Sequence, residues 1–147
     1  MKNRTAQAFT ILAGLIALLD AALKAYAIKR LPSTGSRDRF IDFILHKNPG
    51  IAFDIPVPFW IIGPLTVAVC TWLVWTAYKH WNTQKEVSTA ANIVIIGALG
   101  NLIDRFVNGF TTDYIIIFSR SVINLSDVLI VAGIIALLWY TRDRKTS

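Results

Sequence analysis

The 147-residue sequence has little charge and almost no cysteine. Its single cysteine, Cys70, excludes an intrachain disulfide and a cysteine cluster for a metal ion. Charged residues make up 16% of the chain, whereas a soluble domain carries about 25%. Hydrophobic residues reach 54%, and the mean hydropathy is +0.52. A water-soluble fold of this size could not bury so much apolar surface, so the excess must face lipid.

Long apolar segments account for most of the chain. A helix needs about 20 apolar residues to cross the ~30 Å hydrocarbon core of a bilayer. Three of the segments carry at most one charge each, and the first carries two, Asp20 and Lys24. They predict four transmembrane helices over residues 8–28, 57–78, 87–103 and 122–141. We therefore expect residues 1–147 to form a single-domain, all-α polytopic membrane protein.

The first apolar segment has an alternative interpretation as a cleaved signal peptide, because Lys2 and Arg4 precede it. It is too long for one, and it ends in Ile28-Lys29-Arg30 rather than in small residues at a cleavage site. A retained span is therefore favoured.

The net charge of +6 suits contact with anionic lipid headgroups, and the loops leave no room for a basic face that binds nucleic acid. Lysine and arginine are equally numerous on the two sides, so the positive-inside rule gives no orientation.

Two longer connections, residues 29–56 and 104–121, both follow an odd-numbered span and so emerge on the same side. The first contains Phe40–Leu45, which is apolar enough to form a strand or to lie at the membrane surface. The second contains Tyr114–Phe118, which is too short to cross the membrane as a helix. The β-branched residues of the second run favour a strand. The two runs can pair into a small sheet over one face of the membrane.

Charged groups inside spans are costly and indicate a functional site by default. Asp20 and Lys24 lie four residues apart on one helical face, which suits an ion pair. The favoured interpretation is a structural pair that ties the first helix to the bundle, and a catalytic role is the alternative. Asp104 and Arg105 close the third predicted helix, with Asn101 one turn earlier. Helix capping and headgroup contact would explain Arg105 but would leave Asn101 unexplained.

Asp113 and Asp127 carry the most specific chemical hypothesis. Asp127 lies about one turn inside the fourth predicted helix, and Asp113 starts the apolar run that leads back to that helix. Two carboxylates held close in a partly dry site cannot both ionise, so the pair shares a proton. The ionised member can deprotonate water while the protonated one polarises a carbonyl, as in aspartic proteases. On spacing alone, two unrelated interfacial carboxylates remain the alternative.

Two further classes of protein compete with a peptidase that uses aspartates. A serine–lysine hydrolase would use Ser119 or Ser126, but the only lysine within a span, Lys24, already has Asp20 as a partner. A channel or transport subunit would use the carboxylates as an ion path, but they gather at one face instead of spanning the bilayer.

These elements resemble the bacterial lipoprotein signal peptidases, also called signal peptidase II. Residues 97–105, Gly-Ala-Leu-Gly-Asn-Leu-Ile-Asp-Arg, are similar to the family's most specific stretch. Four shorter motifs, each weak alone, lie before and after this stretch in the family's order: Asp20-x-x-x-Lys24, Asn48-Pro-Gly-Ile-Ala-Phe53, Thr112-Asp113-Tyr114 and Asn124-Leu-Ser-Asp127. Together they cover nearly the whole chain.

The resemblance implies four transmembrane helices, with a small periplasmic β-sheet that cradles the substrate. It implies a multi-pass protein of the cytoplasmic (inner) membrane, with both termini in the cytoplasm and the active site near the periplasmic face. The implied activity is that of an aspartic endopeptidase whose catalytic dyad falls, by motif, on Asp113 and Asp127. The implied substrate is a prolipoprotein, cleaved just before a cysteine that already carries diacylglycerol. We expect a monomer in contact with membrane lipid, and the mechanism needs no cofactor or metal.

The remaining motif residues receive supporting roles. Donors and one flexible backbone position are expected to hold the substrate or the dyad: Asn48, Gly50, Asn101, Arg105 and Asn124. Structural roles are assigned to three more: Asp20, Lys24 and Asp104. Cys70 and His46 are predicted to lie outside the site, with His46 and His80 in different loops.

The sequence departs from the family's usual residues beside both aspartates. Thr112 and Tyr114 replace valine and phenylalanine, Ser126 replaces alanine, and Ile96 stands where glycine is frequent. These exchanges are expected to be tolerated. The short connection between the two aspartates affects the expected shape of the cradle more than the chemistry.

Overall fold

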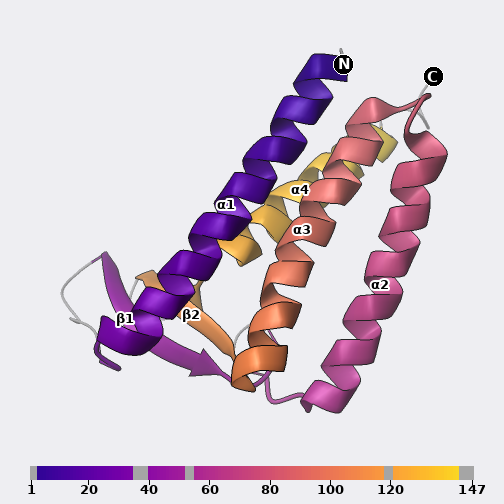
Figure 1. The fold of residues 1–147 in the computed structure, drawn as a ribbon. Coiled ribbons are helices and arrows are strands. Elements are labelled where there is room, and N and C mark those ends of the chain that lie inside the picture. The colour runs from indigo at the N-terminus through magenta and orange to yellow at the C-terminus, as the bar shows by residue number, and fades with distance from the viewer. Residues whose placement is uncertain (1–2, 35–39, 52–54, 118–120, 143–147) are drawn as a thin grey trace.

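The computed structural model describes residues 3–34, 40–51, 55–117 and 121–142. It contains four long helices and one small sheet (Figure 1). The helices are α1 (Asn3–Arg30), α2 (Phe59–His80), α3 (Lys85–Asn108) and α4 (Leu125–Arg142). The strands are β1 (Ile41–Asn48), β2 (Thr111–Ile117) and β3 (Ser121–Ile123), which form an antiparallel sheet in the order β1-β2-β3. The predicted fold class is confirmed.

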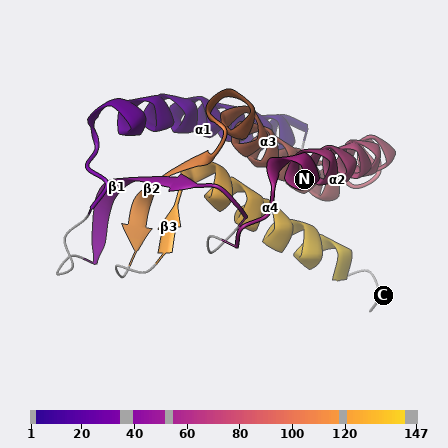
Figure 2. The same cartoon turned by 90° about the horizontal axis from the view of Figure 1, so that it is seen from below.

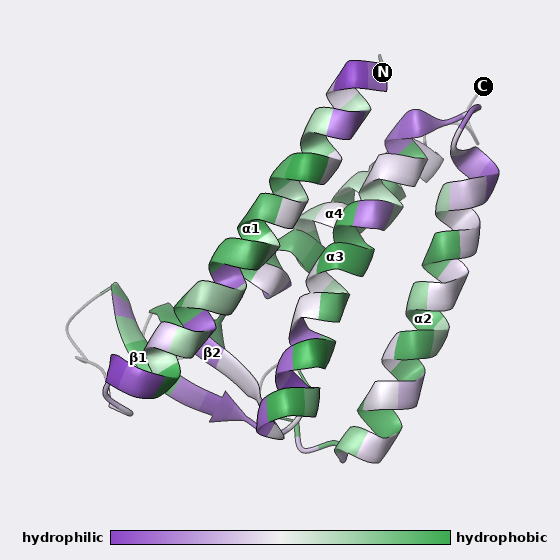
Figure 3. Cartoon of the chain, in the orientation of Figure 1, coloured by the Kyte–Doolittle hydropathy of each residue, from purple (hydrophilic) through white to green (hydrophobic). Residues whose placement is uncertain are grey.

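All four helices are long and apolar enough to cross a membrane. Their large apolar side chains point outward to an extent that water would not tolerate: Leu18 is 70% exposed and Trp60 is 74% exposed. Figure 3 shows hydrophobic residues along the helices, with hydrophilic ones gathered at the start of α1, at the α2–α3 turn and near the sheet. The outer surface of the bundle is therefore suited to lipid.

The helices differ from the predicted ranges mainly at their polar ends. Helix α1 begins at Asn3, and α3 continues to Asn108, because polar residues that interrupt a hydropathy pattern do not interrupt helical hydrogen bonding. Helix α3 ends where Gly109 adopts the left-handed conformation (φ 80°). The Gly109 N–H donates to the carbonyl oxygen of Arg105 at 2.9 Å, which closes the last turn.

Residues 122–123, predicted as the start of the fourth helix, belong to strand β3 (Ser121–Ile123) instead. It continues the ladder of β2, with Ile115 opposite Ile123 and Ile117 opposite Ser121. Strand β1 also extends past the predicted apolar run to Asn48, so His46 lies in a strand and not in a loop. His80 is the last residue of α2 rather than a loop residue.

The sheet lies at the end of the bundle opposite both termini and the α2–α3 turn (Figure 1). Seen from below, it lies beside α1 and the start of α4 and away from α2 (Figure 2). In the β1–β2 pairing, His46 is opposite Asp113 and Asn48 is opposite Thr111, with an irregularity between Phe43 and His46. Opposed residues of paired strands lie on one face, so this pairing brings β1 side chains to Asp113.

Helix α3 is the centre of the bundle and packs on the other three helices. Against α2 it buries a small apolar cluster: Leu73, Ala77, Ala91 and Val94. Against α4 the backbones approach closely at glycines, as small residues allow at helix interfaces in membranes. A Cβ on Gly97 would lie 2.7 Å from the carbonyl oxygen of Ser126, and one on Gly100 would lie 2.5 Å from its Oγ. These glycines bring the start of α4 against α3.

Candidate active site

Asp127 lies in the first turn of α4 and forms a capping box with Asn124. The backbone N–H of Asp127 donates to Asn124 Oδ1 at 2.9 Å. In return, the backbone N–H of Asn124 donates to Asp127 Oδ2 at 3.2 Å. The short Asn-Leu-Ser-Asp sequence therefore starts the helix and fixes the carboxylate at its N-terminus, where the helix dipole favours negative charge.

Asp113 lies in β2 and is 2% exposed. Two asparagine amides donate to its carboxylate: Asn124 Nδ2 to Oδ1 at 2.7 Å and Asn48 Nδ2 to Oδ2 at 3.1 Å. Asn124 thus contacts both aspartates, Asp113 through its amide nitrogen and Asp127 through its carbonyl oxygen and backbone. The structure brings the two predicted aspartates together around this one side chain.

The Asn48 amide is also fixed at its other end. Its Oδ1 accepts the backbone N–H of Gly50 at 2.9 Å, so Nδ2 must face Asp113. Its Nδ2 also lies 3.3 Å from the carbonyl oxygen of Ile51. An amide whose oxygen is already engaged can offer only N–H groups to the carboxylate.

Burial, and after it the nearby charge of Asp127, raise the pKa of Asp113 to about 6. The hydrogen bonds from Asn48 and Asn124 and the charge of His46 act in the opposite direction. Burial dominates because removing a carboxylate from water penalises its charged form. A carboxyl group with this pKa keeps its proton up to about pH 6.

Arg105 and Gly50 meet near the two aspartates. The guanidinium Nη2 of Arg105 donates to the Gly50 carbonyl oxygen at 2.7 Å. A Cβ on Gly50 would overlap the carbonyl group of Ile55, whose oxygen accepts the Ile51 N–H at 3.0 Å. Gly50 is therefore required by close backbone approach. Ala52 and Phe53 of the same motif lie outside the described residues.

Asp20 and Lys24 form the ion pair expected from their spacing, with Nζ 2.9 Å from Oδ2. Both are buried, at 1% and 4% exposure. Asp20 also accepts the Leu125 N–H at 3.0 Å and the Ser126 hydroxyl at 2.6 Å. Through these contacts of Asp20, the pair links α1 to the start of α4.

Asp104 ties α3 to β2. Its Oδ2 accepts the backbone N–H of Thr112 at 2.6 Å, and its Oδ1 accepts the Asn108 amide at 2.7 Å. Lys24 Nζ lies 3.5 Å from Asp104 Oδ2. Asp104 thus braces the strand that carries Asp113.

The departures from the family pattern have contacts that sequence reasoning missed. The Tyr114 hydroxyl donates to Asp20 Oδ1 at 2.8 Å, and the Thr112 hydroxyl lies 3.2 Å from Asp104 Oδ1. Ser126 donates to Asp20 and is fully buried, so it is not an accessible nucleophile. Ser119, the other candidate nucleophile, lies outside the described residues. The missed signal was that the exchanges at Thr112, Tyr114 and Ser126 each introduce a hydroxyl group.

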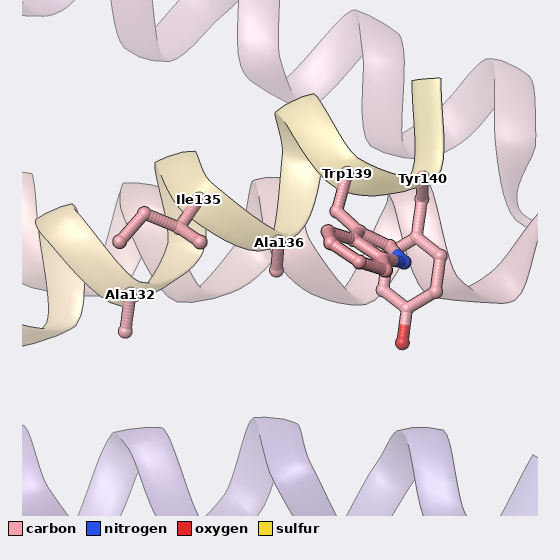
Figure 4. Close-up of a pocket in the computed structure, with 5 residues that line it drawn as sticks. All are labelled: Ala132, Ile135, Ala136, Trp139 and Tyr140. Atoms are coloured by element: carbon pink, nitrogen blue, oxygen red, sulfur yellow. The ribbon is translucent and has the colours of Figure 1, made fainter. Parts of the chain in front are cut away.

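An apolar hollow lies apart from the two aspartates. Figure 4 shows an apolar hollow lined only by α4 residues: Ala132, Ile135, Ala136, Trp139 and Tyr140. It lies toward the C-terminal end of α4, whereas Asp127 is in the first turn, and it has no carboxylate. Among the residues that the structure describes, no cluster of three or more His, Cys, Asp or Glu could hold a metal ion.

Comparison with known proteins gives consistent matches over most of the chain. Residues 12–142 match the family described as signal peptidase (SPase) II. The lipoprotein signal peptidase of Bartonella bacilliformis is 37% identical over 143 residues, covering 88% of this chain and 86% of the relative. That of Streptococcus pneumoniae is 28% identical over 144 residues, covering 94% of this chain and 93% of the relative.

Two solved structures share the fold, both described as bacterial membrane enzymes studied by the in meso method. The first, at 2.3 Å resolution, has a TM-score of 0.78 at 19% identity and covers 92% of this chain and 88% of that one. The second, at 1.9 Å resolution, has a TM-score of 0.75 at 22% identity and covers 88% and 89%.

The fold and the matches define a polytopic membrane peptidase of the aspartic class. The chain belongs to the signal peptidase II family, whose members remove signal peptides from prolipoproteins.

Proposed function

We propose that Asp113 and Asp127 are the catalytic dyad of this peptidase. The observation that carries the assignment is the side chain of Asn124, which joins both carboxylates at the start of α4. Asp127 accepts N–H donors at both oxygens, from Asn101 Nδ2 at 2.8 Å and from the Asn124 backbone at 3.2 Å. Asp113 accepts a similar pair of donors, so it is the dipole of α4, at whose N-terminus Asp127 lies, that favours ionisation of Asp127 over Asp113. Asp113 is the member that holds the proton.

In this mechanism Asp127 is the general base that deprotonates the attacking water, while protonated Asp113 polarises the scissile carbonyl. Collapse of the tetrahedral intermediate then needs a proton on the leaving amide nitrogen, which the dyad supplies. Asn48, Gly50 and Arg105 lie beside Asp113 and are assigned to hold the peptide backbone of the substrate.

The proposed substrate is a prolipoprotein whose cysteine carries diacylglycerol, cleaved just before that cysteine. The dyad lies at the sheet end of four span-length helices, so water can reach it while acyl chains stay in hydrocarbon. This position suits a bond that lies at the boundary between membrane and water.

We further propose that the chain works as one monomeric unit in the inner membrane, in contact with lipid. The two termini lie at the end opposite the sheet (Figure 1), so cytoplasmic termini would put the dyad near the periplasmic face.

The test is a gel-shift assay with a diacylglyceryl-modified prolipoprotein in detergent. Asp113→Asn and Asp127→Asn should each abolish cleavage while leaving a folded, membrane-inserted protein, because an amide is nearly isosteric with a carboxylate but cannot share its proton. Cys70→Ala, which changes a buried residue of α2, is the matched control and should retain cleavage. Near-normal cleavage by either asparagine variant would refute the dyad.

A further inference from the structure

Lys24 makes more contacts than an ion pair requires. Its ammonium reaches three acceptors: Asp20 Oδ2 at 2.9 Å, Asn101 Oδ1 at 2.7 Å and Asp104 Oδ2 at 3.5 Å. An ammonium group has three N–H donors and no acceptor, so the number of its donors matches these three oxygens. Lys24 is 4% exposed, so it is largely shielded from solvent.

The contact with Asn101 has a consequence for the dyad. Because Asn101 Oδ1 accepts from Lys24, its Nδ2 faces the other way and donates to Asp127 Oδ1 at 2.8 Å. Rotating the amide by half a turn would put its NH₂ group against the ammonium and its oxygen against the carboxylate. Both contacts would then be repulsive, so Lys24 determines which atom of Asn101 faces Asp127.

The position of the ammonium is itself fixed. Asp20 is held by the Tyr114 hydroxyl and the Ser126 hydroxyl, at 2.8 and 2.6 Å, and Asp104 is held by the Thr112 N–H at 2.6 Å. Each carboxylate therefore has donors from other elements and cannot follow the lysine if it moves. The cluster keeps Nζ at Asn101.

We propose that Lys24 is a positioning residue for peptide cleavage, which acts through the Asn101 amide to keep a hydrogen-bond donor on Asp127. This inference rests on the proposed role of Asp127 as the catalytic base. It assigns Lys24 a function in the reaction beyond tying α1 to the bundle. The charge of Lys24 anchors the helix, whereas its N–H donor to Asn101 orders the site.

Two substitutions separate these roles, Lys24→Gln and Lys24→Met. Both remove the charge and have similar length, but only glutamine can donate an N–H to Asn101 Oδ1. Lys24→Met should lower kcat about 10–100-fold relative to Lys24→Gln, with similar KM, because small misplacements at a reacting centre cost this much. Equal kcat for the two folded variants would overturn the proposal, since loss of the ion pair alone affects both alike.

If either single variant fails to fold, Lys24→Gln and Lys24→Met are each combined with Asp20→Asn, which removes the charge that the loss of the lysine leaves unpaired.

The unmodified protein gives an independent measurement by NMR. The Asn101 side-chain NH₂ protons should show contacts to the Asp127 β-protons and none to the Lys24 ε-protons. The reverse pattern would overturn the proposal whatever the variants do. Asp127→Asn is run in parallel, because its activity tests the dyad separately from the role of Lys24.

Discussion

At the scale of single residues, the site depends on asparagine amides whose orientation is fixed. Asn48 and Asn124 each have Oδ1 engaged by a backbone N–H, and Asn101 has Oδ1 engaged by Lys24. Each amide must therefore present N–H groups to a carboxylate. Asp113 and Asp127 therefore accept hydrogen bonds from neutral amide donors, which stabilise negative charge without adding positive charge.

The pKa of Asp113, about 6, predicts the alkaline limb of the pH–rate profile. Below that pH Asp113 is mostly protonated and can act as the acid, and above it the proton is lost. We therefore expect kcat/KM to fall as the pH rises through about 6. The measurement is kcat/KM across about pH 5–8 at constant detergent. A rate that rises through this range would contradict the assignment of Asp113 as the protonated member.

His46→Gln tests the residue that the sequence placed outside the site. The charge of His46 lowers the pKa of Asp113, so its removal should move the alkaline limb upward, by less than about one pH unit. The plateau rate should be retained, because no role in bond cleavage is assigned to His46. A limb that moves downward would show that another interaction of His46 dominates.

Tyr114→Phe tests a hydroxyl that looked dispensable in the sequence. It removes one donor from a buried carboxylate, Asp20, which keeps its contacts with Lys24, Leu125 and Ser126. We expect the free energy of unfolding to fall by about 1–3 kcal/mol, measured by thermal denaturation in detergent. An unchanged melting temperature would show that the Tyr114 hydrogen bond adds no stability.

At the scale of elements, glycines set the distance between α3 and α4. Gly97 lets the carbonyl of Ser126 approach, so a methyl group there would push away the first turn of α4, which carries Asp127. Gly133 makes a similar approach to Val94 from the α4 side. The packing of α3 against α4 therefore determines the position of the Asp127 carboxylate.

Gly97→Ala should lower stability by about 1–3 kcal/mol and reduce kcat, because overpacking displaces backbone. Gly14→Ala is the matched control, since a Cβ at Gly14 in α1 meets nothing within 4 Å. Melting temperature and turnover are measured for both. Equal behaviour of the two variants would mean that the α3–α4 contact adapts without cost.

Much of this arrangement could be predicted from the sequence, because hydropathy identifies spans and the carboxylates inside them are few. The ends of elements could not. Residues 121–123 are apolar enough to continue a span, and only their pairing with β2 makes them a strand. His46 was missed for the same reason, since its place opposite Asp113 depends on the register of two segments far apart in sequence. The hydroxyls of Tyr114 and Ser126 depend likewise on where α1 packs.

At the scale of the whole molecule, the two ends of the helix bundle carry different features. The sheet and the buried polar groups lie at one end, and both termini and the α2–α3 turn lie at the other (Figures 1 and 3). Ser33, after α1, and Thr83, in the α2–α3 turn, are exposed at these opposite ends. Chemical labelling of the two positions can therefore orient the chain.

The orientation experiment uses Ser33→Cys and Thr83→Cys, each in a Cys70→Ala background. A membrane-impermeant maleimide added to intact spheroplasts should label position 33 and leave position 83 unlabelled until the membrane is opened. The reverse pattern would place the dyad on the cytoplasmic side and refute the proposed topology.

The rate of cleavage should depend on the diacylglyceryl group of the substrate. Each methylene buried from water is worth about 0.8 kcal/mol, but the acyl chains are already buried in the bilayer before they bind. Their contribution is therefore mainly to position the peptide at the two aspartates. The same prolipoprotein without diacylglycerol should be cleaved far more slowly in a side-by-side time course. Equal rates of cleavage would mean that the enzyme recognises only the peptide part of the substrate.

The capping box of Asn124 and Asp127 also limits how this sequence can be altered by evolution or design. Inserting or deleting one residue between them would turn the Asp127 carboxylate by about 100° around the helix and would also break the capping hydrogen bonds. Single insertions or deletions therefore cannot move this carboxylate and keep its hydrogen bonds with Asn124. The unit that could be transplanted into another scaffold is therefore the whole four-residue block 124–127, and not the aspartate by itself.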